Sequence, residues 1–157
     1  MDQHNVSFSA EKDDLSSALA WIARSLPAKP TQPILRGVLI HANDDGLELF
    51  GFDREVSTRV HISAEVHEPG KMLVAGKLAS DIVGSLPEKS ISMEYEGSKV
   101  IVTCGSSRFE LPAMTLEDYP VLPELPRVTG TIDPQLFSEA IGQVAICLLY
   151  TSPSPRD

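Results

Sequence analysis

Few residues of this 157-residue sequence have the types and spacing that catalysis requires. Cys104, near the end of an expected strand, could act as a nucleophile, but no base stands beside it, so we expect a partly buried apolar side chain. Asp53 and Glu55 could pair as acid and base, but their place in "GFDREVS" favours a turn. The histidines are scattered: His4, His41, His61 and His67. Because the sequence has no metalloprotease, serine-hydrolase or phosphate-loop motif, nothing positive indicates an enzyme.

The basic residues form a more informative pattern. Lys29 lies between two prolines in "PAKPTQP", and their fixed φ angles reduce the freedom that is lost when its side chain is positioned. Lys12 and Arg24 share one face of an expected helix through i, i+4 spacing, and Lys77 begins the next helix. This pattern fits a solvated helix face, where Arg24 also complements the helix dipole. The sharper alternative is a small, polar and basic face that meets a polyanion.

The composition limits where such a face can be. The net charge of −9 argues against a protein coated in nucleic acid, but it permits positive charge that is confined to one face. The polar, acidic first residues do not resemble a secretory signal, and no apolar run approaches the roughly 18 residues of a membrane helix. The two cysteines have no metal-ligand spacing. We therefore expect a cytoplasmic protein that needs no metal and no cofactor and contacts no membrane.

The elements that must position these residues occur twice along the chain. Residues 8–26 predict a strand and a helix, and three strands follow at 34–42, 46–52 and 55–63. The same order then returns as a strand, a helix and three strands, at 71–76, 77–86, 91–96, 99–105 and 107–114. Two helical stripes are predicted to be buried: Leu15, Ala18, Leu19 and Ile22 in the first helix, and Leu78, Ile82 and Leu86 in the second. The fold class is therefore α+β, with two β-α-β-β-β repeats and two helices packed on one face of an antiparallel sheet.

The proline-rich segment "LEDYPVLPELPRVTG" predicts an extended linker. After it, "TIDPQLFSEAIGQVA" predicts a strand and a helix that can be laid over the first helix, with Phe137 on Leu15 and Ile141 on Leu19. The helical pattern is lost in "ICLLYTSPSPRD". Three parts are expected: a complete domain at 1–126, the start of a second domain at 127–145, and a non-native tail at 146–157.

Four segments together resemble the first domain of the bacterial sliding clamps, the beta subunit of DNA polymerase III. They are "PTQPILRGVLI", "GFDREVS", "VAGKLASDIVGSLP" and "RFELPAMTLEDYP", and the resemblance runs from about Val6 to Ala145. It implies the DNA-clamp fold and a non-catalytic ring, in which two three-domain subunits close head to tail around duplex DNA. Helices line the hole, sheets form the outer wall, and the ring tethers the replicative polymerase after a clamp loader has placed it on DNA.

The same resemblance assigns roles to individual residues. Lys29 and Lys77 fall on positions that contact DNA phosphates without reading sequence, and Arg24 and Lys12 extend that basic helix face. Phe109 and Leu111 fall on the strand that contacts the other subunit, although core packing would explain them equally well. The tail does not fit the family, so a truncated gene with foreign final residues is expected.

The sequence therefore predicts a DNA sliding clamp that makes the replicative polymerase processive. Two alternatives remain open. One is a small α+β enzyme with an unrecognised site, which a strongly perturbed carboxylate or cysteine in a cleft would favour. The other is a protein-interaction module without DNA affinity, which salt-independent behaviour on DNA would favour.

Overall fold

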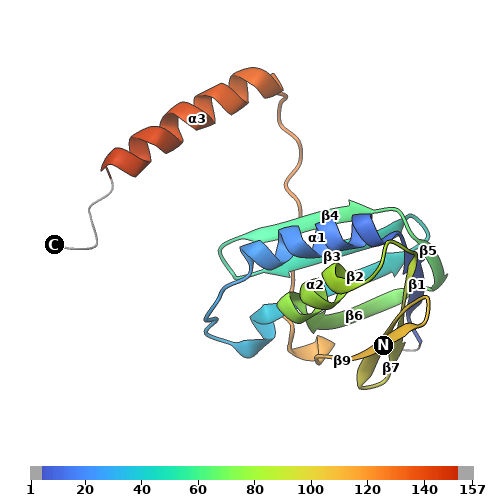
Figure 1. Cartoon of the computed structure of the whole chain (residues 1–157). Coiled ribbons are helices and arrows are strands. Elements are labelled where there is room, and N and C mark those ends of the chain that lie inside the picture. The colour runs from blue at the N-terminus through green and yellow to red at the C-terminus, as the bar shows by residue number, and fades with distance from the viewer. Residues whose placement is uncertain (1–4, 152–157) are drawn as a thin grey trace. The chain divides into compact units, whose positions relative to one another are not determined.

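The computed structural model describes residues 5–151, and in the last helix it describes side chains only as far as residue 147. The chain divides into two units, Met1–Pro123 and Glu124–Asp157, which are described separately (Figure 1). In the described part of the chain, no helix is both long enough and apolar enough to cross a membrane.

The elements of the first unit follow the predicted order with one addition. They are β1 (Ser7–Ala10), α1 (Lys12–Ser25), the 3-10 turn η1 (Pro33–Arg36), β2 (Gly37–Asn43), β3 (Gly46–Phe52), β4 (Ser57–Ile62), β5 (Glu65–Glu68), β6 (Gly70–Ala75), α2 (Gly76–Ser85), β7 (Ile91–Glu96), β8 (Lys99–Cys104), β9 (Ser107–Pro112) and the 3-10 turn η2 (Leu116–Asp118). The addition is β5, which lies between the predicted strands at 55–63 and 71–76 and pairs with β1. The η1 turn replaces the start of a predicted strand, because Pro33 fixes φ at its first position.

The strands form two antiparallel sheets where one was expected. Their strand orders are β5-β1-β7-β8-β9 and β4-β3-β2-β6. The first strand of each repeat joins the sheet of the other repeat: β1 pairs with β7, and β6 pairs with β2. This exchange links the two repeats through main-chain hydrogen bonds. The predicted α+β class with two β-α-β-β-β repeats is confirmed.

Both helices pack on the sheets through their apolar stripes (Figure 1). The stripe predicted for α1 is confirmed, because Leu15, Ala18, Leu19 and Ile22 are all buried. The stripe predicted for α2 is partly wrong: Leu78 is 42% exposed, whereas Ala79 and Val83 are buried. The cause is the close approach of α2 to its neighbours: a Cβ on Gly76 would lie 2.5 Å from Leu26 Cδ1 at the end of α1. Small residues permit this approach, and a pattern of large apolar residues does not reveal them.

Two hairpin turns depend on glycines with positive φ angles. Gly46, the first residue of β3, adopts a φ of +124°, and Gly97, between β7 and β8, adopts a φ of +71°. Residues other than glycine seldom adopt such angles. In the first turn the Asn43 side chain also accepts a hydrogen bond from the amide of Asp45 at 2.9 Å. These turns fix the register of the strands that support the helices.

The second unit contains α3 (Pro134–Thr151). Asp133 begins it by accepting hydrogen bonds from the amides of Gln135 and Leu136, both at 3.0 Å. The prediction that the helical pattern stops after Ala145 is wrong for the backbone, because the helix continues through residues 146–151, where no proline interrupts it. The predicted strand before the helix is not formed, since a strand needs a partner and the described residues of this unit supply none. Residues 152–157 of the predicted tail lie outside the described residues.

Candidate nucleic-acid interface

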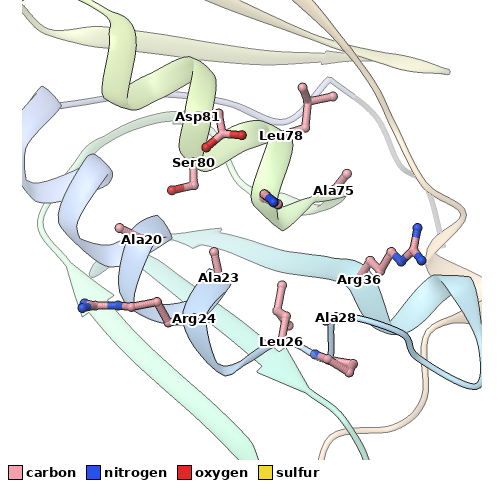
Figure 2. A pocket seen from close by; sticks show the side chains of 12 residues that line it. Ala20, Ala23, Arg24, Leu26, Ala28, Arg36, Ala75, Leu78, Ser80 and Asp81 are labelled. Atoms are coloured by element: carbon pink, nitrogen blue, oxygen red, sulfur yellow. The ribbon is translucent and has the colours of Figure 1, made fainter.

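One end of the helix pair borders a cleft of about 990 Å³. The helices are antiparallel neighbours, since Lys12 at the start of α1 bonds to Glu88 just after α2, and the opposite ends carry Arg24 and Lys77. The cleft has apolar walls and a polar rim. Its lining residues are Ala20, Ala23, Arg24, Leu26, Pro27, Ala28, Arg36, Ala75, Lys77, Leu78, Ser80 and Asp81. The exposed Leu78 is therefore part of the cleft wall (Figure 2).

Three positively charged residues line this cleft. Arg24 comes from the last turn of α1, Lys77 from the first turn of α2, and Arg36 from the end of η1. Figure 2 shows Arg24 and Arg36 on opposite sides of the cleft. Asp81 is the one carboxylate among the lining residues, so cations exceed anions there by two. Such an excess on a concave surface attracts anionic ligands, and arginine in particular can bind phosphate with two hydrogen bonds.

Sequence reasoning missed Arg36. The residue lies inside the segment "PTQPILRGVLI", most of which was interpreted as a strand. In a strand, Arg36 would be an ordinary position with no link to the helix ends. The proline at the start of η1 was the available signal, because it favours a turn over a strand at that point. The turn brings Arg36 to the same end of the domain as Arg24 and Lys77.

Lys29 lies beside the cleft and not in its lining. It is exposed in the loop between α1 and η1, and its neighbours Pro27 and Ala28 line the cleft. The structure therefore brings Arg24, Lys29 and Lys77 to one end of the helix pair, together with Arg36.

Lys12 is separated from this group. It precedes Arg24 by twelve residues of the same helix, which corresponds to about 18 Å along the axis. Its Nζ donates to Glu88 Oε1 at 2.9 Å, its side chain is 15% exposed, and the carboxylate of Glu88 raises the pKa of Lys12. The i, i+4 pattern places Lys12 and Arg24 on one face of α1. It could not show that Glu88, in the segment after α2, approaches the start of α1. Lys12 already has an anionic partner.

Charged side chains of both signs lie on the sheet faces that point away from the helices, where Lys99 pairs with Glu96 and Arg108 lies near Glu110. In β7, Met93 and Tyr95 belong to the core, so Glu94 and Glu96 between and after them point outward. In β9 the buried Leu111 likewise places Glu110 outward, where it pairs with Lys99 at 3.1 Å. The negative net charge is thus compatible with a basic helix end on the same domain.

The two residues predicted for a subunit contact have different environments. Both lie in β9, an edge strand of its sheet, opposite Val102 and Val100 of β8. Phe109 is 39% exposed, and Leu111 is 1% exposed within the core. Leu111 therefore packs inside the domain, and Phe109 is the side chain of the two that a partner can reach.

The residues first considered for catalysis take structural positions. Cys104 is buried, as predicted, and points at the carbonyls of Pro87 and Lys89. Asp53 Oδ1 accepts hydrogen bonds from the amides of Val56 and Glu55, and these bonds lower the pKa of Asp53. The predicted turn role of Asp53 is thereby confirmed. Among residues 5–151, no group of three or more histidine, cysteine, aspartate or glutamate side chains is arranged to hold a metal ion.

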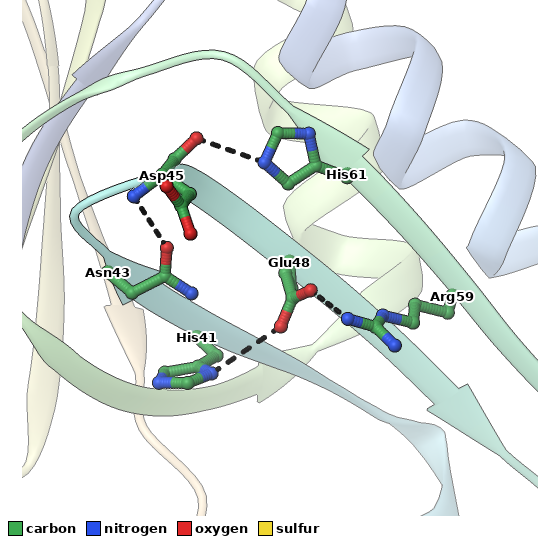
Figure 3. Close-up of polar contacts among 6 residues, drawn as sticks. All are labelled: His41, Asn43, Asp45, Glu48, Arg59 and His61. Carbon is green, nitrogen blue, oxygen red and sulfur yellow. Dashed lines mark hydrogen bonds and ion pairs between the residues drawn. The ribbon is translucent and has the colours of Figure 1, made fainter. Parts of the chain in front are cut away.

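A polar cluster occupies the outer face of the four-stranded sheet (Figure 3). Glu48 accepts a hydrogen bond from Arg59 and lies 3.7 Å from His41 Nδ1, and Arg59 chiefly lowers the pKa of Glu48. His61 lies on the neighbouring strand and contacts the carbonyl oxygen of Asp45 at 3.0 Å. The cluster spans three adjacent strands by cross-strand pairing. We interpret it as a surface network that stabilises the sheet.

A sequence model of the family described as "DNA polymerase III beta subunit, N-terminal domain" matches residues 6–123. The chain belongs to this family. It is 46% identical to the beta sliding clamp of Streptomyces coelicolor over 136 residues, which cover 87% of this chain and 36% of that protein. It is also 46% identical to the beta sliding clamp of Micrococcus luteus, over 88% of this chain and 45% of that protein.

Solved structures of sliding clamps are also similar to this chain. The beta chain of DNA polymerase III from Streptococcus pneumoniae superposes with a TM-score of 0.79 at 26% identity, covering 87% of this chain and 38% of that one. The sliding clamp of Pseudomonas aeruginosa, solved with bound griselimycin, superposes with a TM-score of 0.68 at 31% identity, covering 78% and 34%. The DNA-clamp fold implied by the sequence is confirmed. The chain spans between one third and one half of the length of these relatives.

Proposed function

We propose that this domain contacts duplex DNA as part of a sliding clamp. The observation that carries the proposal is the convergence of Arg24, Lys29 and Lys77 at one end of the paired helices, joined there by Arg36. Family membership supports the same reading, because the relatives are beta sliding clamps. In this proposal the cations at this helix end face the DNA backbone, and the sheet faces without helices point away from it.

The proposed contact is to phosphates and not to base edges. Lys29 and Lys77 present point charges on long side chains, which suit phosphates that pass at varying positions. Two helices that lie side by side offer a broad surface instead of a single helix that enters the major groove. Contacts of this kind release counterions and fix no sequence register, so the domain can move along DNA.

The remaining parts of the proposal concern a longer protein. Residues 1–126 form the first clamp domain, and residues 127–145 begin a second. Two such proteins close a head-to-tail ring in the cytoplasm, with exposed Phe109 on one side of the subunit contact and buried Leu111 supporting it from the core. The ring is a non-catalytic partner of the replicative polymerase and its clamp loader.

Binding of a short labelled duplex across a series of salt concentrations tests the proposal. We expect the double variant Lys29→Ala, Lys77→Ala to bind more weakly, because each lysine neutralises about one phosphate. The slope of log K against log salt should flatten by about 0.9 for each lost contact, so by about 1.8 in total. The loss should be equal for duplexes of different sequence.

Lys71→Ala supplies the matched control. Lys71 is an exposed lysine on β6, and its neighbour Met72 is in the core, so Lys71 points to the face without helices. We expect its loss to leave the salt slope unchanged. Equal slopes for the wild type and the double variant would remove the two lysines from the interface. A loss confined to one DNA sequence would contradict the proposed mode of contact.

A further inference from the structure

The loop that carries Lys29 is held at both ends. At its start the amide of Leu26 donates to the carbonyl of Ala23 at 3.3 Å, which ends α1. At its far end the carbonyl of Gln32 accepts from the amide of Leu35 at 3.1 Å, which begins η1. Between these points the sequence "PAKPTQP" has three prolines, so few backbone angles remain free. The position of Lys29 therefore depends on how firmly the Gln32 end is fixed.

Arg54 provides a second anchor at Gln32. Its Nη2 donates to the side-chain Oε1 of Gln32 at 2.7 Å, a distance typical of charge-assisted hydrogen bonds. Gln32 and Arg54 are 22 residues apart in the chain, so the bond ties the Lys29 loop to the turn between β3 and β4. Gln32 is thus fixed through its main chain on one side and its side chain on the other.

The turn around Arg54 is itself unusual. Arg54 has a φ of +80°, a left-handed angle that glycine or asparagine adopts at lower energy than arginine. Asp53 holds the turn in place: its Oδ1 accepts from the amides of Glu55 at 2.9 Å and Val56 at 2.6 Å. The amide of Asp53 also donates to the carbonyl of Val56 at 3.2 Å. A rigid, strained turn therefore aims the guanidinium of Arg54 at the loop.

From this geometry we infer that Arg54 is a positioning residue for Lys29, acting through Gln32. Its guanidinium fixes the far end of the proline-rich loop and so holds Lys29 beside the basic cleft before DNA arrives. The consequence for DNA binding rests on the proposed function, whereas the anchoring of the loop does not. Without the anchor, the loop must be ordered during binding, and ordering one side chain and its loop costs about a two- to tenfold loss of affinity.

Two variants of the whole chain test the inference. Gln32→Ala removes the acceptor and changes no charge. Arg54→Asn removes the guanidinium and keeps a residue that tolerates positive φ. In both variants we expect the NMR order parameters of the Ala28, Lys29 and Thr31 amides to fall, from about 0.85 toward 0.6, with the other amides unchanged. Unchanged order parameters in Gln32→Ala would overturn the inference, whether or not the chain binds DNA.

A short labelled duplex provides the second readout. We expect both variants to bind about two- to tenfold more weakly, and Gln32→Ala to keep the salt slope of the wild type. Both losses should disappear when Lys29 is already alanine, because the anchor then holds nothing that contacts DNA. Arg54→Asn could instead still weaken duplex binding and flatten the salt slope in the Lys29→Ala background. That result would show that Arg54 itself contacts a phosphate, and it would overturn the positioning role. Absence of DNA binding by the wild type would refute the proposed function alone, since the order parameters still decide the anchor.

Discussion

Replacing Leu111 and Phe109 separately by alanine should distinguish a core residue from a surface residue on the same strand. Both side chains lie on one face of β9, opposite Val100 and Val102. Leu111 is 1% exposed, and Phe109, two residues earlier, is 39% exposed. Leu111 belongs to the core cluster, whereas Phe109 does not. The two substitutions should therefore differ in their effect on the free energy of unfolding.

The expected magnitudes follow from burial. Leu111→Ala removes a fully buried side chain and leaves a cavity, which costs about 2–5 kcal/mol and lowers Tm by about 8–20 °C for a unit of this size. Phe109→Ala removes a larger side chain, but solvent fills the vacated space and no cavity term is added. We expect a loss of about 1–2 kcal/mol, which lowers Tm by about 4–8 °C. Leu125→Ala is the matched control, because Leu125 is 68% exposed and its loss should leave Tm unchanged.

Urea and thermal unfolding measure both losses. Trp21 is the single tryptophan and lies on α1, so its fluorescence reports the first unit without a contribution from α3. Far-UV circular dichroism provides a second signal, and agreement between the two supports two-state unfolding. Equal losses for the two variants, or a larger loss for Phe109→Ala, would refute the assignment of Leu111 to the core and of Phe109 to the surface.

Two further predictions concern Gly46 and Glu48 of β3, with Gly97 in the β7–β8 turn as a comparison for Gly46. Gly46→Ala should destabilise the chain by about 2–4 kcal/mol, because Gly46 has a φ of +124° and the new Cβ would lie 2.5 Å from the Ile62 carbonyl oxygen. Gly97 has a φ of +71° but open space around it, so Gly97→Ala should cost only about 1 kcal/mol. Urea unfolding measures both losses. Glu48→Gln should lower stability by about 0.5–1 kcal/mol at neutral pH, because it removes the ion pair with Arg59. Since Arg59 lowers the pKa of Glu48 in the folded state, this difference should be present above the unfolded pKa of about 4.3 and disappear as pH falls through the folded pKa. A difference that grows on acidification would contradict the sign of the shift.

The fold was largely predictable because its signals are local. The apolar stripe of α1 depends on residues within one helix, and it was interpreted correctly. The division into two sheets was not predictable in this way. It depends on β1 pairing with β7 and β6 pairing with β2, and such long-range pairing leaves no periodic pattern. The buried face of α2 was partly misread for a related reason, since small residues form it.

The candidate site depends more on non-local contacts than the fold does. Lys29 and Lys77 were singled out by their places beside prolines and at a helix start, which are local features. Lys12 satisfied the same helical pattern as Arg24, yet Glu88 arrives from 76 residues away and pairs with it. Arg36 and Arg54 carried no periodic signal, because one ends a 3-10 turn and the other holds a left-handed turn. Each becomes informative only when a distant segment lies against it: the two helix ends for Arg36 and the Lys29 loop for Arg54. The sequence therefore identifies the individual residues that carry the charge of this surface. Their arrangement in space depends on which loops the two-sheet fold brings to the same end of the domain.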